Sequence, residues 1–228
     1  MRLFELFENV PSSDSLGRMK VPPQTDSDKA RVTVKGSGSY GTVYQDRDNP
    51  HEVMKFSTPP EMDRGKGTMD GYLNYIREIA ANENIQENPW VPRIRKLRLH
   101  RDKKGVVVDY SVRLESLQQL SSLKIPELLA MGERLFKGAA YKQIEQSSNE
   151  PRNPEYWTTT ALIDAIRRCI YEPEEAHRIT NDDDLIQYAH WHAIVHKRNQ
   201  RSLDIRGPNI MVRRTPYGTQ PVITDPWA

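Results

Sequence analysis

Cysteine, long apolar stretches and excess charge are all scarce in this sequence. One cysteine among 228 residues excludes an internal disulfide and a cysteine-rich zinc site. No apolar run is long enough to cross a membrane, and the N-terminus has no signal-peptide core, so we expect a cytoplasmic protein without a membrane partner. A net charge of +2 gives no support for a nucleic-acid partner.

What remains has the composition of a globular protein with polar loops. Hydrophobic residues make up 36% and charged residues 28% of the chain, which is long enough for one core or for two small lobes around a cleft. Residues 9–29 are rich in Pro, Ser and Asp and have no periodicity. We therefore predict a flexible N-terminal arm over 1–29, a first lobe over 30–117 and a second lobe over 118–228.

The hydrophobic pattern predicts an α+β fold. An N-terminal antiparallel sheet with one helix is followed by a mainly helical region and then by two short strands. The predicted strands are 31–35, 42–46, 53–56, 93–101, 106–115, 210–213 and 221–224, and the predicted helices include 70–86 and 182–198.

The most informative motif lies near the C-terminus. Asp204 is followed by Asn209, an apolar strand, and then Asp225 after a second apolar strand. Phosphoryl transfer needs an aimed hydroxyl and a held metal–nucleotide complex, and this pattern can supply both. Asp204 would orient the acceptor hydroxyl, Arg206 would neutralise the transferring phosphoryl group, and Asn209 and Asp225 would bind Mg²⁺. The alternative is a polar turn before a strand, which leaves Asp225 unexplained.

A glycine-rich motif lies near the other end of the chain. Gly36, Gly38 and Gly41 fall between two predicted strands, with Tyr40 before the third glycine and Val43 after it. Such a hairpin tip can fold closely over phosphates and offer its backbone N–H groups. The strand–turn–strand setting disfavours a dinucleotide-binding motif, in which a helix follows the glycines. A glycine-rich hairpin without a ligand is the alternative.

Lys55 lies on the strand that follows the glycine motif. Beside Met54 it would be half-buried, and a buried ammonium needs an anion, such as the ATP phosphates together with a helix carboxylate. We assign that carboxylate to Glu78, which lies 11 residues before the turn at Pro89, rather than to Glu83. A surface lysine with its head in solvent is the alternative.

The order of these motifs is the order found in protein kinases. A glycine loop, then Lys55, then Asp204 with Asn209, then Asp225 follow one another as they do in that family. Over residues 31–228 the chain resembles the eukaryotic-like protein kinases. The resemblance implies a two-lobed fold that binds ATP and Mg²⁺, here with a reduced C-terminal lobe that lacks an activation segment.

The chain looks most like the early serine/threonine protein kinases of short-tailed bacteriophages. The segment Tyr110–Leu117 and the ending around Asn209 and Ile223–Pro226 carry this resemblance. It implies that the backbone from Glu115 to Leu117 meets adenine and that Val53 covers the ring. It also implies host proteins as substrates, within the host bacterial cytoplasm.

Some positions depart from the kinase pattern. Ser202-Leu203 replaces His-Arg before the catalytic Asp, and Pro226-Trp227 replaces Phe-Gly after the metal-binding Asp. No Ala-Pro-Glu motif follows. Arg206 is closer to the serine/threonine pattern, which has Lys there, than to the tyrosine pattern.

Two other functions fit parts of the sequence. A pseudokinase that inhibits a host protein would explain the missing substrate-binding features, although the retained Lys, Asp, Asn and Asp argue against it. A small-molecule kinase of the aminoglycoside or choline type would share the motif at Asp204 and Asn209. His192 and His196 have metal-ligand spacing on a predicted helix, but no third ligand is evident, so we expect them to pack the helix.

Overall fold

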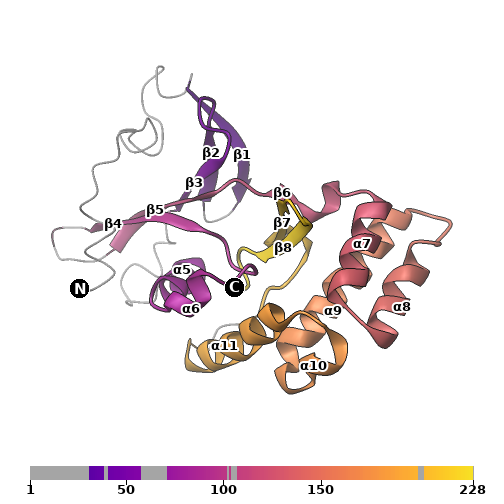
Figure 1. Ribbon diagram of the computed structural model, residues 1–228. Coiled ribbons are helices and arrows are strands. Elements are labelled where there is room, and N and C mark those ends of the chain that lie inside the picture. The colour runs from indigo at the N-terminus through magenta and orange to yellow at the C-terminus, as the bar shows by residue number, and fades with distance from the viewer. Residues whose placement is uncertain are drawn as a thin grey trace. The chain divides into compact units, whose positions relative to one another are not determined.

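The computed structural model describes residues 31–38, 41–57, 71–101, 103, 107–199 and 203–227. An antiparallel sheet forms from the N-terminal part and a helical region follows it, so the predicted α+β class is confirmed (Figure 1). The predicted arm over 1–29 lies outside the described residues.

Five antiparallel strands form the N-terminal sheet, in the order β1-β2-β3-β5-β4. The sequence favours strands here because Val, Thr and Tyr recur at alternating positions. The strands are β1 (Val32–Gly38), β2 (Gly41–Asp46), β3 (Glu52–Ser57), β4 (Ile94–Arg101) and β5 (Val107–Glu115).

Helix α5 (Gly71–Ala80) packs on one face of this sheet. The ring of Tyr72 stacks on that of Tyr110 from β5, with centroids 6.3 Å apart. Tyr75 and Ile76 of the helix and Val112 of the sheet are fully buried. The apolar stripe of α5 therefore forms a core against β5.

The predicted helix over 70–86 is wrong in extent, because the chain breaks it after Ala80. Asn82 begins a second short helix, α6 (Glu83–Gln86), by accepting the backbone N–H of Ile85 with its side chain. Asparagine is a favourable N-cap, and it competes with helix continuation at this position.

The chain divides into two compact units. The first contains the described residues up to Ala81 together with Arg93–Ser116, and the second contains Asn82–Pro92 together with those from Leu117 onward. The β1–β5 sheet and α5 form the first unit. The helical region and a second sheet form the other.

Helix α9 is the central helix of the second unit and packs against α7, α8, α10 and α11. The strands of this unit, in the order β6-β7-β8, form an antiparallel sheet. Its elements are β6 (Gln118–Gln119), η1 (Leu120–Ser122), α7 (Ile125–Leu135), α8 (Gly138–Ser147), α9 (Pro154–Tyr171), η2 (Pro173–Glu175), α10 (Ala176–Ile179), α11 (Asp183–Asn199), η3 (Gly207–Asn209), β7 (Ile210–Thr215) and β8 (Gly218–Ile223).

The segment Asn82–Pro92 is tied into the second unit by hydrogen bonds. The buried Trp90 donates its indole N–H to Asp182 at 3.2 Å, and its carbonyl accepts the Ile223 N–H at 2.8 Å. Arg213 donates to the carbonyls of Pro89 and Val91. These contacts place the start of α11 and the end of β8 around Trp90.

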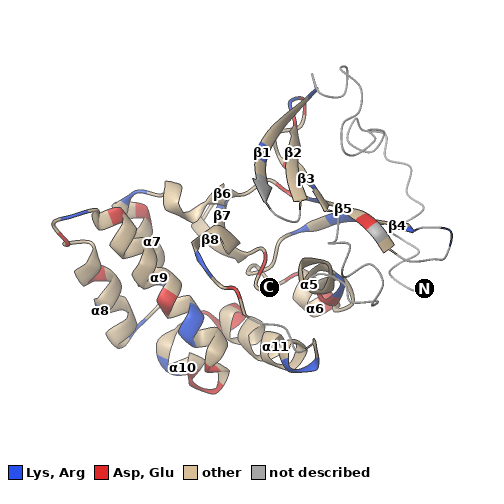
Figure 2. Cartoon of the chain, turned by 180° about the vertical axis from the view of Figure 1, so that it is seen from behind, with Lys and Arg blue, Asp and Glu red and all other residues tan. Residues whose placement is uncertain are grey.

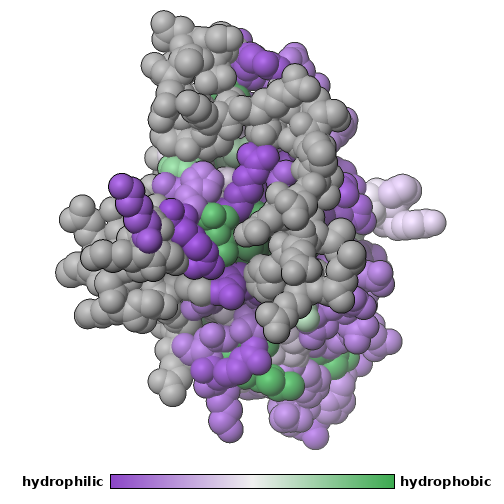
Figure 3. All heavy atoms as spheres, turned by 90° about the vertical axis from the view of Figure 1, so that its left-hand side faces the viewer, coloured by the Kyte–Doolittle hydropathy of each residue, from purple (hydrophilic) through white to green (hydrophobic). Residues whose placement is uncertain are grey.

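Charged residues of both signs are interspersed over helices α7–α11 (Figure 2). On the face shown in Figure 3, hydrophilic side chains predominate and hydrophobic ones form small separate patches among the described residues. No helix in the described part of the chain is long and apolar enough to span a membrane.

Candidate functional site

Asp204, Arg206 and Asn209 are brought together by the loop that follows α11. Arg206 forks onto the Asp204 carboxylate, with Nε 2.7 Å from Oδ1 and Nη2 2.7 Å from Oδ2. The Asn209 amide nitrogen donates to the Asp204 backbone carbonyl at 2.6 Å and to its Oδ2 at 3.1 Å. The orientation of the Asp204 carboxylate is therefore set by two neighbours in the same loop.

The segment after β8 returns to this loop and brings Asp225 with it. The Asn209 carbonyl accepts the Thr224 N–H at 2.8 Å and the Thr224 hydroxyl at 3.1 Å. The Pro226 carbonyl accepts the Asp204 N–H at 2.7 Å. Asp225 therefore lies between two residues that are each hydrogen-bonded to the candidate catalytic loop.

Helix α9 supports the same loop from within the second unit. The Arg167 guanidinium donates to the carbonyl of Ile205, the buried residue that follows Asp204, and it also pairs with Asp164 at 3.1 Å. Arg167 thus fixes the backbone of the loop while Asn209 fixes the Asp204 side chain.

The C-terminal segment is anchored to helix α11 by Trp227. Its indole N–H donates to Nε2 of His192 at 2.8 Å, and both side chains are buried, which confirms the predicted packing role of His192. Burial, with a smaller contribution from the neighbouring His196, lowers the pKa of His192 to about 3. His192 is therefore neutral at pH 7, as an acceptor from Trp227 must be.

Asn209 and Asp225 offer a donor set that suits Mg²⁺. The amide nitrogen of Asn209 is used by Asp204, which leaves the side-chain oxygen of Asn209 as its candidate metal ligand, and Asp225 adds a half-buried carboxylate. Among the described residues no three His, Cys, Asp or Glu side chains gather as a metal-binding group. Two oxygen ligands nevertheless fit Mg²⁺, which binds few protein groups and completes its shell with phosphates and water.

In the first unit, strand register places Val43, Val53 and Lys55 on one face of the sheet. Val43 pairs with Lys55 across β2 and β3, and Val53 is two residues from Lys55 on the same strand. The Lys55 ammonium lies over the ring of Tyr72, 3.3 Å from its centroid. This face is therefore the one that α5 covers, and Lys55 is held there partly by a cation–π contact.

The glycine motif is part of the β1–β2 hairpin. Gly36 and Gly38 end β1, Gly38 pairs with Gly41, and Tyr40 lies outside the described residues. A side chain at Gly41 would meet the Phe56 carbonyl oxygen at 2.3 Å, whereas at Gly36 nothing lies within 4 Å. Gly41 is thus required by close packing on β3, and Gly36 is open to its surroundings.

The remaining candidates also have defined positions. Glu78 is half-buried on α5. The Glu115 N–H donates to the Arg93 carbonyl at 3.2 Å and ends β5, while Leu117 begins the part of the chain that belongs to the second unit. The predicted nucleotide-binding residues up to Glu115 therefore belong to the first unit, and Leu117 and the residues from Asp204 to Asp225 belong to the second.

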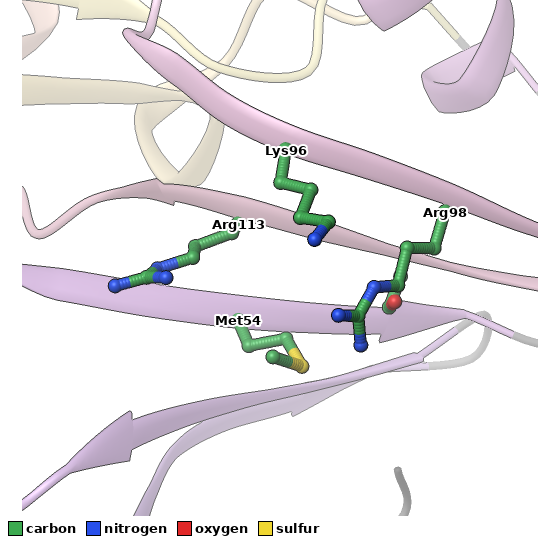
Figure 4. A pocket seen from close by; sticks show the side chains of 5 residues that line it. Met54, Lys96, Arg98 and Arg113 are labelled. Carbon is green, nitrogen blue, oxygen red and sulfur yellow. The ribbon is translucent and has the colours of Figure 1, made fainter. Parts of the chain in front are cut away.

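The opposite face of the first sheet is basic. Lys96 and Arg98 from β4 and Arg113 from β5 surround Met54 from β3 (Figure 4). The pocket between them holds ≈ 10 Å³, room for about one water molecule. Arg113 also pairs with Glu52 across the sheet. This pocket is too small for a nucleotide.

Sequence reasoning missed three residues that organise the site: Tyr72, Arg167 and Thr224. Each acts through a contact between segments far apart in the chain, and Arg167 is 38 residues from Ile205. No local pattern signals such a contact, although Leu73, Ile76 and Ala80 recur at helical spacing and lie on the buried face of α5 beside Tyr72.

Comparison with models of known protein families and with curated proteins finds no match for this chain. The functional assignment therefore depends on the residues themselves.

Proposed function

We propose that the protein is an ATP-dependent phosphotransferase with a protein-kinase-like arrangement, acting on serine or threonine of proteins. The observation that carries the proposal is the hydrogen-bonded set in the second unit, in which Asp204, Asn209 and the segment around Asp225 are joined. A polar turn before a strand does not require an Asp on a returning segment to be held beside it.

Each residue of this set then has a role. Asp204 orients the acceptor hydroxyl and takes its proton. Asn209 and Asp225 hold Mg²⁺, which neutralises charge on the ATP phosphates when it is bound. Arg206 is 64% exposed, and exposed ion pairs are weak, so its guanidinium can turn from Asp204 to the more highly charged phosphates.

The first unit supplies the nucleotide-binding residues in this proposal. Lys55 pairs with the phosphates, with Glu78 as its carboxylate partner, and Gly36, Gly38 and Gly41 allow close approach of the hairpin backbone. Val43 and Val53 cover the adenine ring from the sheet face that they share with Lys55. Glu115 and Leu117 would contact adenine through their backbone. The resemblance to phage kinases supplies the expectation that the substrates are host proteins.

The test is transfer of labelled phosphate from Mg·ATP, with and without bacterial lysate. We expect labelled protein bands with the intact chain, a loss of about 10³-fold in kcat for Asp204→Asn with ATP affinity retained, and weaker Mg·ATP binding for Asp225→Asn. Asp183→Asn, at an exposed position early in α11, is the matched control and should behave as the intact chain.

Other outcomes point elsewhere. Label on small molecules instead of proteins would favour an aminoglycoside- or choline-type kinase. Absence of turnover together with capture of a specific protein would favour a pseudokinase. Full transfer by Asp204→Asn or Asp225→Asn would refute the assigned roles.

A further inference from the structure

A groove of ≈ 410 Å³ lies beside the candidate catalytic loop, wholly within the second unit. Tyr156, Thr160 and Ile163 of α9 line one side, and Gly207 and Pro208 of the loop line the other. A volume of this size is typical of ligand-binding pockets. The helix that supports the loop through Arg167 therefore also forms a recess next to it.

The groove lies within a short distance of the proposed acceptor site. Gly207 is three residues after Asp204, so their Cα atoms are at most roughly 11 Å apart. An extended peptide advances ~3.3 Å per residue. A peptide whose acceptor hydroxyl meets Asp204 would therefore reach the groove with a residue up to about three positions away.

The lining favours an apolar peptide side chain over a charged one. Tyr156, Ile163 and Pro208 provide apolar surface, and Ser121 provides a hydroxyl that can bond to an extended backbone. The Thr160 hydroxyl already donates to the Tyr156 carbonyl at 2.9 Å. Among the residues that the structure describes, Arg167 is the one charged residue that lines the groove, and it is already bonded to Ile205 and Asp164. No carboxylate from the described part of the chain lines the groove, so no described residue there would select a basic side chain.

Exposure of the rim also indicates a ligand larger than a metabolite. The Tyr156 side chain is 62% exposed and its ring meets that of Trp157 edge-on at 5.2 Å. Exposed neighbouring aromatic side chains are typical of surfaces that contact another protein.

We propose that this groove seats an extended segment of the protein substrate, with an aliphatic side chain about three residues from the acceptor hydroxyl. The inference depends on the proposed function, because it takes Asp204 as the acceptor site. It assigns substrate selection to α9 and to the loop after Asp204.

The test uses the full chain and sets of synthetic peptides that carry one Ser or Thr. Each set fixes Leu, Ala, Asp or Arg at one position on either side of the acceptor. We expect kcat/KM to be about tenfold higher for Leu than for Ala at a position about three residues away, on one side only. Arg at that position should give no advantage.

A pair of tyrosines on the same helix gives a matched comparison. Tyr156→Ala should reduce the preference for Leu over Ala to about twofold or less, because one wall of the groove is lost. Tyr171→Ala removes another exposed tyrosine, 50% exposed, at the other end of α9 and outside the groove, and should keep the full preference.

The outcomes separate this inference from the proposed function. Peptide labelling without a positional preference, or with a preference that Tyr156→Ala retains, overturns the groove assignment and leaves the kinase activity standing. Labelled lysate proteins with no labelled peptide also overturn it. If neither peptides, lysate proteins nor water receive phosphate from Mg·ATP, the proposed function itself fails.

Discussion

The two units hold their candidate residues in different ways. In the second unit, Asp204, Asn209 and the segment at Asp225 are fixed by individual hydrogen bonds to one another and by Arg167. In the first unit, the register of antiparallel strands sets the positions of Lys55 and its neighbours. The hydrogen bonds in the second unit can be removed one at a time by single substitutions. In the first unit, residue positions change mainly when a substitution displaces the backbone of the sheet. Substitutions in the two units should therefore have different consequences.

The largest expected effect is on the pH dependence of the second unit. His192 has a pKa of about 3 when folded and 6.5 as its ordinary value, so between these values the unfolded chain binds more protons. The contribution of His192 to the free energy of unfolding is fully present above pH 6.5 and is lost as the pH falls towards 3. Between pH 7 and pH 4 the loss is about 3 kcal/mol.

His192→Gln isolates this contribution. Gln cannot titrate, yet its side-chain oxygen can still accept the Trp227 indole N–H. Urea unfolding of both proteins at pH 7, 5.5 and 4 should show a smaller loss for the variant. Equal pH dependence of the two free energies of unfolding would mean that His192 does not have the lowered pKa.

A glycine pair tests the first unit in the same way. Gly41→Ala places a methyl group 2.3 Å from the Phe56 carbonyl oxygen and should lower the free energy of unfolding by about 2 kcal/mol. Gly36→Ala meets nothing within 4 Å and should leave stability nearly unchanged.

The tryptophans make this measurement specific to one unit. All 4 of them belong to the second unit, so their fluorescence reports on that unit alone. We expect Gly41→Ala to lower the urea midpoint seen by circular dichroism more than the midpoint seen by fluorescence. Equal shifts by both probes would show that the two units unfold together.

Much of the fold was predictable because it is encoded locally. The apolar pattern predicted all five strands of the first sheet and, in the second sheet, β7 and β8 but not the two-residue β6. The end of α11 and the hairpin at Thr215–Gly218 followed from ordinary periodicity and turn residues. The helix break after Ala80 was missed because the apolar pattern continues through it. Asn82 gave the signal, as a residue that caps helices better than it continues them.

The residues of the candidate site were more predictable than their supports. The candidate residues form a pattern in the sequence, set by the types and order of Lys55, Asp204, Asn209 and Asp225. In the second unit, hydrogen bonds join Asp204, Asn209 and the segment that contains Asp225. The residues that hold them in place act through tertiary contacts, such as Lys55 over Tyr72 and Trp227 with His192. Local sequence patterns do not predict contacts of this kind.

A lysine pair compares the two faces of the first sheet. Lys55→Met removes the ammonium that we assign to the phosphates and should raise the Kd for Mg·ATP at least about tenfold. Lys96→Met removes an ammonium from the opposite face, where the pocket is too small for a nucleotide, and should leave the Kd unchanged. Titration with a fluorescent ATP analogue measures both. Equal losses would indicate a general effect of sheet charge and would contradict a specific role for Lys55.

The smallest expected effect concerns two neighbouring arginines of α9. Arg167 bonds to the Ile205 carbonyl, whereas Arg168, the next residue, is exposed and lines a different pocket. Arg167→Met should lower kcat about fivefold with the Kd for Mg·ATP unchanged, since it loosens the loop that aims Asp204 and leaves the first unit intact. Arg168→Met should keep the full kcat, and Arg167→Lys should recover part of the loss because an ammonium can still donate to the carbonyl. A change in Kd equal to that in kcat would mean that Arg167 supports nucleotide binding as well, and that the two units do not divide binding and chemistry between them.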